Sequence, residues 1–233
     1  MWRWIILWDV RRFARRGNES LAREGPPCQT QRATVRLEDI ERALAAHEPS
    51  RIPLQRVFRK AAVAAIFRRA STLELLFIRR AEHPRDPWSG HMAFPGGRMD
   101  PIDDTPLDAA IRETREELGL DLERHGQNLG ALSAVPATAH GKPVPLVISP
   151  FVFSLCETPP PPSLTPNHEV QEVVWIPIDF FLNPSHRTRM QREIAGIPVN
   201  LPCYDYQSRR IWGLTLRMVD ELLAIVRGQA SSI

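Results

Sequence analysis

The chain has 233 residues, which is enough for one domain with a sizeable hydrophobic core and an extension beside it. Its content of 43% hydrophobic and 24% charged residues is ordinary for a globular protein, and its net charge is +3. The three cysteines form neither a disulfide framework nor a zinc-binding spacing, so we expect a reducing, cytoplasmic location.

Positive charge is concentrated in residues 1–36. This segment holds eight arginines and three acidic residues, a net charge of +5, which leaves −2 on the remainder of the chain. A nucleic-acid-binding surface is therefore not expected on the remainder of the chain, residues 37–233. The apolar run at residues 1–8 is too short to cross a membrane, so no stable membrane insertion is expected. We interpret residues 1–36 as a basic, poorly ordered extension, and a transit peptide or a weak membrane-surface anchor remains open.

The remaining chain alternates strand-like and helix-like patterns, which is typical of the α/β class. Residues 37–56 are predicted to be an amphipathic helix, over residues 37–48, followed by a connector, and residues 57–233 are predicted to be the main domain. Strands are expected at residues 61–67, 74–80, 129–137, 144–156 and 170–176, and the two sides of a hairpin at 200–206 and 209–212. Helices are expected after residue 105, at 177–182 as a short turn, and at 214–227. The proline-rich residues 157–167 are expected to form a surface loop.

The helix after residue 105 has clear signals at both ends. Thr105 is a good N-cap, Pro106 suits the first helical position and Asp108 completes a capping box. Gly119 fits the left-handed position that ends a helix. Residues 94–97, Phe-Pro-Gly-Gly, form a turn upstream, so the order is strand, glycine-rich turn, acidic helix.

Glu113, Glu116 and Glu117 lie at positions i, i+3 and i+4 of this helix and therefore share one face. Carboxylates so close repel one another, and a hard divalent cation such as Mg²⁺ is the natural partner for them. The alternative is a solvated helix that is stabilised by pairs such as Arg112–Glu116.

The whole motif resembles the Nudix box. The match runs from Arg112 to Leu120, with Thr114 at a position that is usually aliphatic. Upstream, Asp104 stands where a glutamate is expected and Gly97 lies one residue early. This expanded turn is similar to the coenzyme A diphosphatase branch of Nudix hydrolases, as are three flanking segments, residues 75–81, 90–97 and 210–215. Trp88 departs from that branch, which usually has a histidine there.

The resemblance implies an α/β/α sandwich with a mixed β-sheet and a hydrolase that depends on Mg²⁺ or Mn²⁺. It implies that Glu113, Glu116, Glu117 and the Gly97 carbonyl bind metal, and that the three glutamates are catalytic, with Glu116 the first choice to orient or deprotonate water. Outside the box, the reserve candidates for a base are Glu169 and Glu172. An ion pair between Arg112 and Asp104 is expected to fix the turn against the helix.

The expected substrate is a nucleoside diphosphate linked to another group. Coenzyme A is the first choice, with 3′,5′-ADP and 4′-phosphopantetheine as products. The alternatives are a nucleotide sugar, a dinucleotide, a damaged nucleoside triphosphate, or a non-catalytic ligand-sensing role; a homodimer is left open. Candidate phosphate-binding residues are Arg79, Arg80 and Arg85. Trp88 and Trp212 are candidates for stacking on a base, with a core position as the alternative for at least one of them.

Overall fold

A computed structural model describes residues 35–50, 52, 59–84, 86–139, 142–156, 161–194 and 197–228. The expectations for residues 1–34 and for Arg85 lie outside these residues, as does most of the connector at 51–56. The helices are α2 (Leu37–Ala45), α3 (Pro106–Leu118), α4 (Leu122–His125), α5 (Ile178–Leu182), the short 3-10 helix η2 (Pro184–His186) and α6 (Gly213–Val226). The strands of the main sheet are β1 (Arg59–Arg69), β2 (Leu73–Arg80), β3 (Met92–Ala93), β4 (Gly96–Arg98), β5 (Gly126–Ala131), β6 (Val135–Ala139), β7 (Lys142–Leu155) and β8 (Val170–Pro177). Three further strands form a second sheet, β9 (Arg187–Ile194), β10 (Ile197–Tyr206) and β11 (Arg209–Trp212).

The main sheet is mixed. Its two long strands, β1 and β7, run parallel from Arg59 opposite Leu146 to Phe67 opposite Ser154. All other neighbouring strands in it pair antiparallel. Both long strands are rich in apolar residues because both of their faces are covered.

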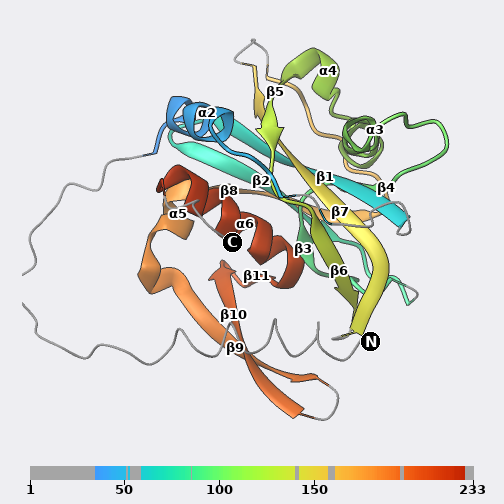
Figure 1. Cartoon of the computed structure of the whole chain (residues 1–233), viewed down its shortest axis with the longest axis vertical. Helices are drawn as coiled ribbons and strands as arrows, with labels where there is room; N and C mark the ends of the chain where they lie inside the picture. The colour runs from blue at the N-terminus through green and yellow to red at the C-terminus, as the bar shows by residue number, and fades with distance from the viewer. Residues whose placement is uncertain are drawn as a thin grey trace, which may run out of the picture. The chain divides into compact units, whose positions relative to one another are not determined.

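Successive side chains of a strand point to opposite faces of the sheet, and this separates two hydrophobic layers. On β1, Ala64 and Ile66 pack in one cluster with Leu118 at the end of α3. Ala65 and Phe67 pack on the other face in a cluster that includes much of α6. The helices α3 and α4 therefore lie on one side of the sheet and α6 on the other (Figure 1). The expected α/β/α sandwich with a mixed sheet is confirmed.

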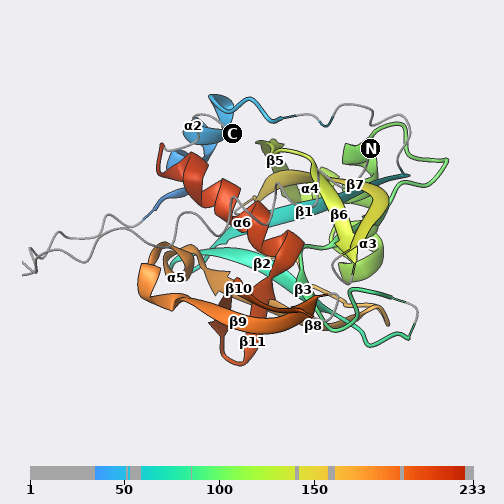
Figure 2. The same ribbon diagram turned by 60° about the horizontal axis from the view of Figure 1, so that its bottom comes forward.

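The helix α2 belongs to the layer on the α6 side. Its buried residues Leu37, Ile40 and Leu44 are in the same cluster as the buried face of α6. Figure 2 shows α2 near one end of α6, which runs in front of the main sheet. Within the described ranges, none of the helices combines the length and the apolar composition that crossing a bilayer requires.

The sequence-based assignment was incomplete. The short helix α4 was not expected, β4 begins inside the predicted turn, and two further strand regions differ. The strand expected at residues 129–137 is two strands, β5 and β6, and Leu132–Ala134 between them is irregular. The strand β9 was missed because its side chains are largely charged and exposed, with only Met190 buried, so it lacks an alternating apolar pattern. The hairpin of β10 and β11 is confirmed, and its turn places Gln207 and Ser208 at φ angles of 47° and 68°.

A split between β1 and β2 positions the glycine-rich turn. These strands pair only where Phe67–Arg69 meets Leu73–Leu75, and then diverge. Farther along, β2 pairs with β3 at Ile78 and Arg79, while β1 pairs with β4 at Ala61–Val63. The chain from β3 to β4 thus lies between two splayed strands, and the glycine-rich turn that precedes α3 lies inside the sheet.

Candidate active site

The ends of α3 are formed as the sequence predicts. The Thr105 hydroxyl accepts a hydrogen bond from the backbone N–H of Asp108 (3.3 Å), and the Asp108 carboxylate accepts one from the N–H of Thr105 (2.8 Å). Gly119 ends the helix with φ 65°. Thr114 is fully buried where an aliphatic residue is usual, and its hydroxyl donates to the Ala110 carbonyl at 2.7 Å. Both ends of α3 are therefore well defined, and the positions of its glutamates along the helix are fixed.

The two glycines of the turn are required by close contacts. Gly96 has φ 143°, and a Cβ atom there would lie 2.2 Å from the Ala62 carbonyl oxygen. A Cβ at Gly97 would lie 2.5 Å from the Glu113 carboxylate. The backbone of β4 thus approaches both β1 and the acidic face of α3 more closely than any side chain allows.

Arg112 is the organising cation of the site, and its partner is Asp103. Its Nε and Nη2 atoms lie 3.0 Å from the two carboxylate oxygens of Asp103. Nη2 also donates to the Arg98 carbonyl, which ties the turn to the helix. The hydrogen bonds from Arg112 lower the pKa of Asp103. The expected pair with Asp104 is wrong: Asp104 is exposed, because the loop places the preceding carboxylate against the guanidinium.

Glu117 is the most buried of the three glutamates, with a side chain only 2% exposed. Its carboxylate accepts a hydrogen bond from the backbone N–H of Gly96 at 2.8 Å, and Nη1 of Arg80 lies 3.9 Å away. Burial raises the pKa of Glu117 to about 7, although that hydrogen bond and the charge of Arg80 oppose the shift. A carboxylate in this position is poorly compensated by the protein alone.

Glu113 and Glu116 differ in surroundings although they lie on the same helix face. Glu113 is largely buried beside Gly97, and burial raises its pKa while Arg112 opposes the shift. The Glu116 side chain is 56% exposed and accepts a hydrogen bond from Nη1 of Arg112 at 3.1 Å. Arg112 also donates to Glu113, so it bridges the two carboxylates.

These residues suit a divalent cation by their chemistry. Glu113 and Glu117 lie against two successive glycines, are buried and have raised pKa values, so a cation would relieve the cost of their charges. Among the described residues, no three acidic, histidine or cysteine side chains already converge as metal ligands. Arg112 holds Glu116 through a hydrogen bond, so Glu116 would have to leave it to join the other two.

Of the three candidate arginines, the two that the structure describes, Arg79 and Arg80, lie on opposite sides of β2. Arg80 points to the α3 side, where its Nε donates to Asp86 (2.8 Å) and its Nη1 approaches Glu117. Arg79 faces the other side of β2, as alternation requires, and its charge acts on Glu172. Arg85 lies outside the described residues. The ion pair of Arg80 with Asp86 was not predicted, because the two residues are joined only by the fold of the intervening loop.

The two reserve glutamates are also separated. Glu172 receives hydrogen bonds from Arg209, which lower the pKa of its carboxyl group. Glu169 is exposed, and its charge contributes to the raised pKa values of both Glu113 and Glu117. Glu169 is therefore the one that lies near the acidic site, whereas Glu172 is engaged elsewhere.

Of the two tryptophans that could stack on a base, Trp88 is engaged in contacts within the protein. Its Nε1 donates to the Thr138 carbonyl at 3.1 Å, and its ring packs beside Ala61 and Ala137. The Trp212 ring instead contacts His91 and lies under the guanidinium of Arg192.

Comparison with known proteins gives a match to the family model described as the NUDIX domain, over residues 58–195. An uncharacterized protein of Schizosaccharomyces pombe is 40% identical over 120 residues, which cover 50% of this chain and 36% of that protein. The human mitochondrial coenzyme A diphosphatase NUDT8 is 32% identical over 155 residues, covering 65% of this chain and 62% of the relative. The mouse peroxisomal coenzyme A diphosphatase NUDT7 is 29% identical over 141 residues, covering 60% and 55%. The chain thus matches between 36% and 62% of the length of these relatives.

Proposed function

Because this chain belongs to the Nudix family, whose domain model spans residues 58–195, we propose that it is a divalent-metal-dependent pyrophosphohydrolase. Its substrate is a nucleoside diphosphate linked to a second group. Coenzyme A or one of its derivatives is the first choice, cleaved to 3′,5′-ADP and 4′-phosphopantetheine. Either Mg²⁺ or Mn²⁺ serves as the metal.

The observation that carries this proposal is the pair of buried glutamates beside the glycine-rich turn. Glu113 and Glu117 are held out of water by α3 and β4. Among the described residues, the Gly96 N–H, the more distant Arg80 and the shared Arg112 offset their charge, but the pKa of each carboxyl group stays raised. A site with excess buried carboxylate favours a hard cation.

The residues divide the work of hydrolysis. Glu113, Glu117 and the Gly97 carbonyl would hold the metal, which when bound would polarise phosphate oxygens and lower the pKa of water. Glu116 is exposed and lies one helical turn after Glu113, the glutamate that contacts Gly97. Glu116 accepts a proton from the attacking water. The oxygen of that water bonds to one phosphorus while the bridging P–O bond of the anhydride breaks, and the other phosphate leaves with the bridging oxygen and the electron pair of that bond. Arg112 orients Glu113 and Glu116, and the Gly96 N–H positions Glu117, whose charge the more distant Arg80 partly offsets.

Two observations support coenzyme A as the substrate. Two of the relatives described above are named coenzyme A diphosphatases. The turn before α3 has the expanded spacing from Gly97 to Arg112 that resembles the same branch. All three box glutamates are also retained, which favours an enzyme over a ligand-sensing domain.

A panel of diphosphates tests the proposal. Coenzyme A, acetyl-coenzyme A, ADP-ribose, a nucleotide sugar, diadenosine tetraphosphate and an oxidised nucleoside triphosphate are each incubated with Mg²⁺ or Mn²⁺, and products are identified by mass. We expect the highest kcat/KM with the coenzyme A compounds and release of 3′,5′-ADP. Faster cleavage of another compound would contradict coenzyme A as the substrate, while the proposed diphosphate hydrolysis would still hold. Binding without cleavage of any compound would instead support a sensing role.

A further inference from the structure

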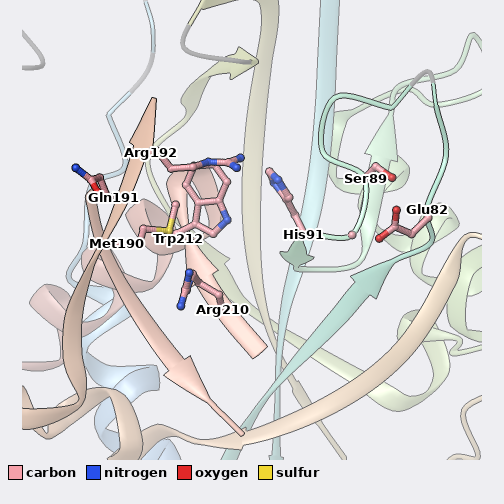
Figure 3. A pocket seen from close by; sticks show the side chains of 9 residues that line it. Glu82, Ser89, His91, Met190, Gln191, Arg192, Arg210 and Trp212 are labelled. Atoms are coloured by element: carbon pink, nitrogen blue, oxygen red, sulfur yellow. The ribbon is translucent and has the colours of Figure 1, made fainter. Parts of the chain in front are cut away.

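A cavity of about 440 Å³ lies beside β3, between the loop that follows β2 and the small sheet β9–β11 (Figure 3). The loop contributes Glu82 and His91, and the small sheet contributes Arg192, Arg210 and Trp212. Glu113, Glu116 and Glu117 are not among its lining residues. The cavity is therefore separate from the acidic site.

The indole of Trp212 offers a surface for a planar group. The Cζ atom of Arg192 lies 4.6 Å from the centre of that ring. His91 approaches the same indole, with ring centres 4.8 Å apart and planes inclined at 60°. In Figure 3 Arg192 lies next to the indole and His91 lies on the side toward the loop. An aromatic base can take the place of the guanidinium and stack on Trp212, because the ring face binds either kind of planar group.

The charges in the cavity favour an anion. Arg210 is held in place by two hydrogen bonds to Asp205, at 2.7 and 3.1 Å. Within the described part of the chain, the guanidinium of Arg192 has no carboxylate or carbonyl partner, and it contacts the ring of Trp212. Its hydrogen-bond donors are thus available to a ligand, and a guanidinium suits phosphate through paired donors.

The cavity and the acidic site are joined through Arg80. Its backbone N–H donates to the His91 carbonyl at 3.0 Å, while its guanidinium lies 3.9 Å from Glu117. His91 and Gly97 are six residues apart in the sequence, so the chain between them spans at most about 20 Å. One extended nucleotide-containing molecule can reach both places.

We propose that this cavity binds the nucleotide end of the substrate, with the base stacked on Trp212 and a phosphate outside the hydrolysed diphosphate bound by Arg192. Arg210 supplies a second, fixed positive charge. This inference rests on the proposed function, and it names the side chains that select a nucleotide with an additional phosphate, such as a 3′-phosphate. It also gives Arg192 a phosphate-binding role, although Arg192 lies far in the sequence from the Nudix-box motif that ends at Leu120.

Substrate discrimination provides the first test, with Arg192→Ala and a matched control, Arg189→Ala. Both substitutions remove one arginine from β9, but Arg189 is not a lining residue and donates instead to the Asn200 carbonyl. We expect Arg192→Ala to lower kcat/KM for coenzyme A about tenfold, mainly through KM, with little change for dephospho-coenzyme A. Arg189→Ala should change neither. Equal losses for both substrates, or in both variants, would overturn the assignment of Arg192.

Direct binding provides a test that needs no turnover. Calorimetry measures binding of 3′,5′-ADP and of 5′-AMP to the full-length protein in EDTA. We expect 3′,5′-ADP to bind more tightly than 5′-AMP, and Arg192→Ala to remove most of that difference. Trp212→Ala should weaken both ligands about tenfold, and Trp212→Phe should retain binding because its ring still stacks.

The two tests separate the cavity from the catalytic proposal. If the enzyme is active but Arg192→Ala and Trp212→Ala leave its binding of 3′,5′-ADP unchanged, the cavity is not the nucleotide site, and the proposed function still stands. A protein that cleaves no diphosphate but loses 3′,5′-ADP binding in both variants would refute the proposed function and support the cavity as a nucleotide site.

Discussion

Arg112 and Asp103 form a two-point ion pair, in which Nε and Nη2 of the guanidinium each lie 3.0 Å from a carboxylate oxygen. The Asp103 side chain is only 3% exposed, so the pair is shielded from water. It connects the loop before α3 to the residue that also contacts Glu113 and Glu116. The position of the acidic face therefore depends on a loop residue outside the helix.

Asp103→Asn tests this pair. We expect it to lower the free energy of unfolding by about 2 kcal/mol at pH 7, because it weakens a buried, charge-assisted contact. Asp104→Asn, at the exposed neighbour, should change it by less than about 0.5 kcal/mol. Because the pKa of Asp103 is lowered in the folded state, its stabilisation is present above its ordinary value of 3.8 and is lost as the pH falls through the folded value. Denaturant titrations of both variants at pH 7 and pH 3 measure this, and equal effects of the two variants would contradict it.

Glu116→Gln should abolish hydrolysis while the fold is kept. The carboxylate is largely exposed, so its replacement leaves no buried group unpaired, but it removes the proposed proton acceptor. We expect the rate to fall at least about a hundredfold and the melting temperature to stay within a few degrees. Glu123→Gln, which removes another exposed acid that pairs with Arg115, is the control. Near-normal turnover of Glu116→Gln would direct attention to Glu169.

Glu117→Gln should stabilise the metal-free protein at neutral pH. The pKa of Glu117 is raised from its ordinary value of 4.5 to about 7, so the folded state retains a proton that the unfolded state releases between these values. Stability should therefore fall by about 3 kcal/mol as the pH rises from 4.5 to 7, and then level off. The glutamine variant should lack this loss while having no activity. Unfolding in EDTA across this pH range measures the difference, and parallel curves for wild type and variant would reject the explanation.

Gly97→Ala should impair metal binding more than folding. The added Cβ would meet the end of the Glu113 side chain at 2.5 Å, and that flexible end can shift at little cost to stability. The displaced carboxylate then no longer faces the turn. We expect affinity for Mn²⁺ to fall about tenfold or more, with a small change in melting temperature. Calorimetric titration with Mn²⁺ tests this, and Gly213→Ala on α6 is the control for metal affinity, because its added Cβ meets no atom within 4 Å. The positive φ angle of Gly213 adds a strain to that variant which Gly97→Ala does not have, so melting temperatures are compared with wild type only.

Truncation separates the extension from α2. We expect deletion of residues 1–34 to leave the melting temperature and the turnover rate nearly unchanged, because that segment has no helical or strand periodicity that would dock it. In the truncated protein, Ile40→Ala should lower the free energy of unfolding by about 2 to 5 kcal/mol, because Ile40 is fully buried in the α6 layer. Thermal and denaturant melts compare the three proteins. A large loss of stability on deletion alone would show that the extension packs on the domain.

Local sequence patterns were sufficient for the elements whose structure is locally determined. The capping residues Thr105 and Asp108 and the terminal Gly119 defined α3, because these hydrogen bonds and the left-handed φ angle involve neighbours in the chain. The i, i+3, i+4 spacing likewise placed Glu113, Glu116 and Glu117 on one face. The family resemblance then supplied the class of chemistry and the sandwich fold.

The tertiary structure decided what surrounds each of these side chains. Glu116 and Glu117 are adjacent in sequence, yet one is largely exposed and the other is 2% exposed against the Gly96 N–H. Asp103 rather than Asp104 faces Arg112, and Arg192 on the unpredicted strand β9 lies over Trp212. Burial, and hence pKa and partner choice, depends on which distant segments pack against a residue. The sequence alone determined the residues that form the acidic helix face, whereas only the packing of β4, the loop before α3 and the small sheet determined the environment of each charge.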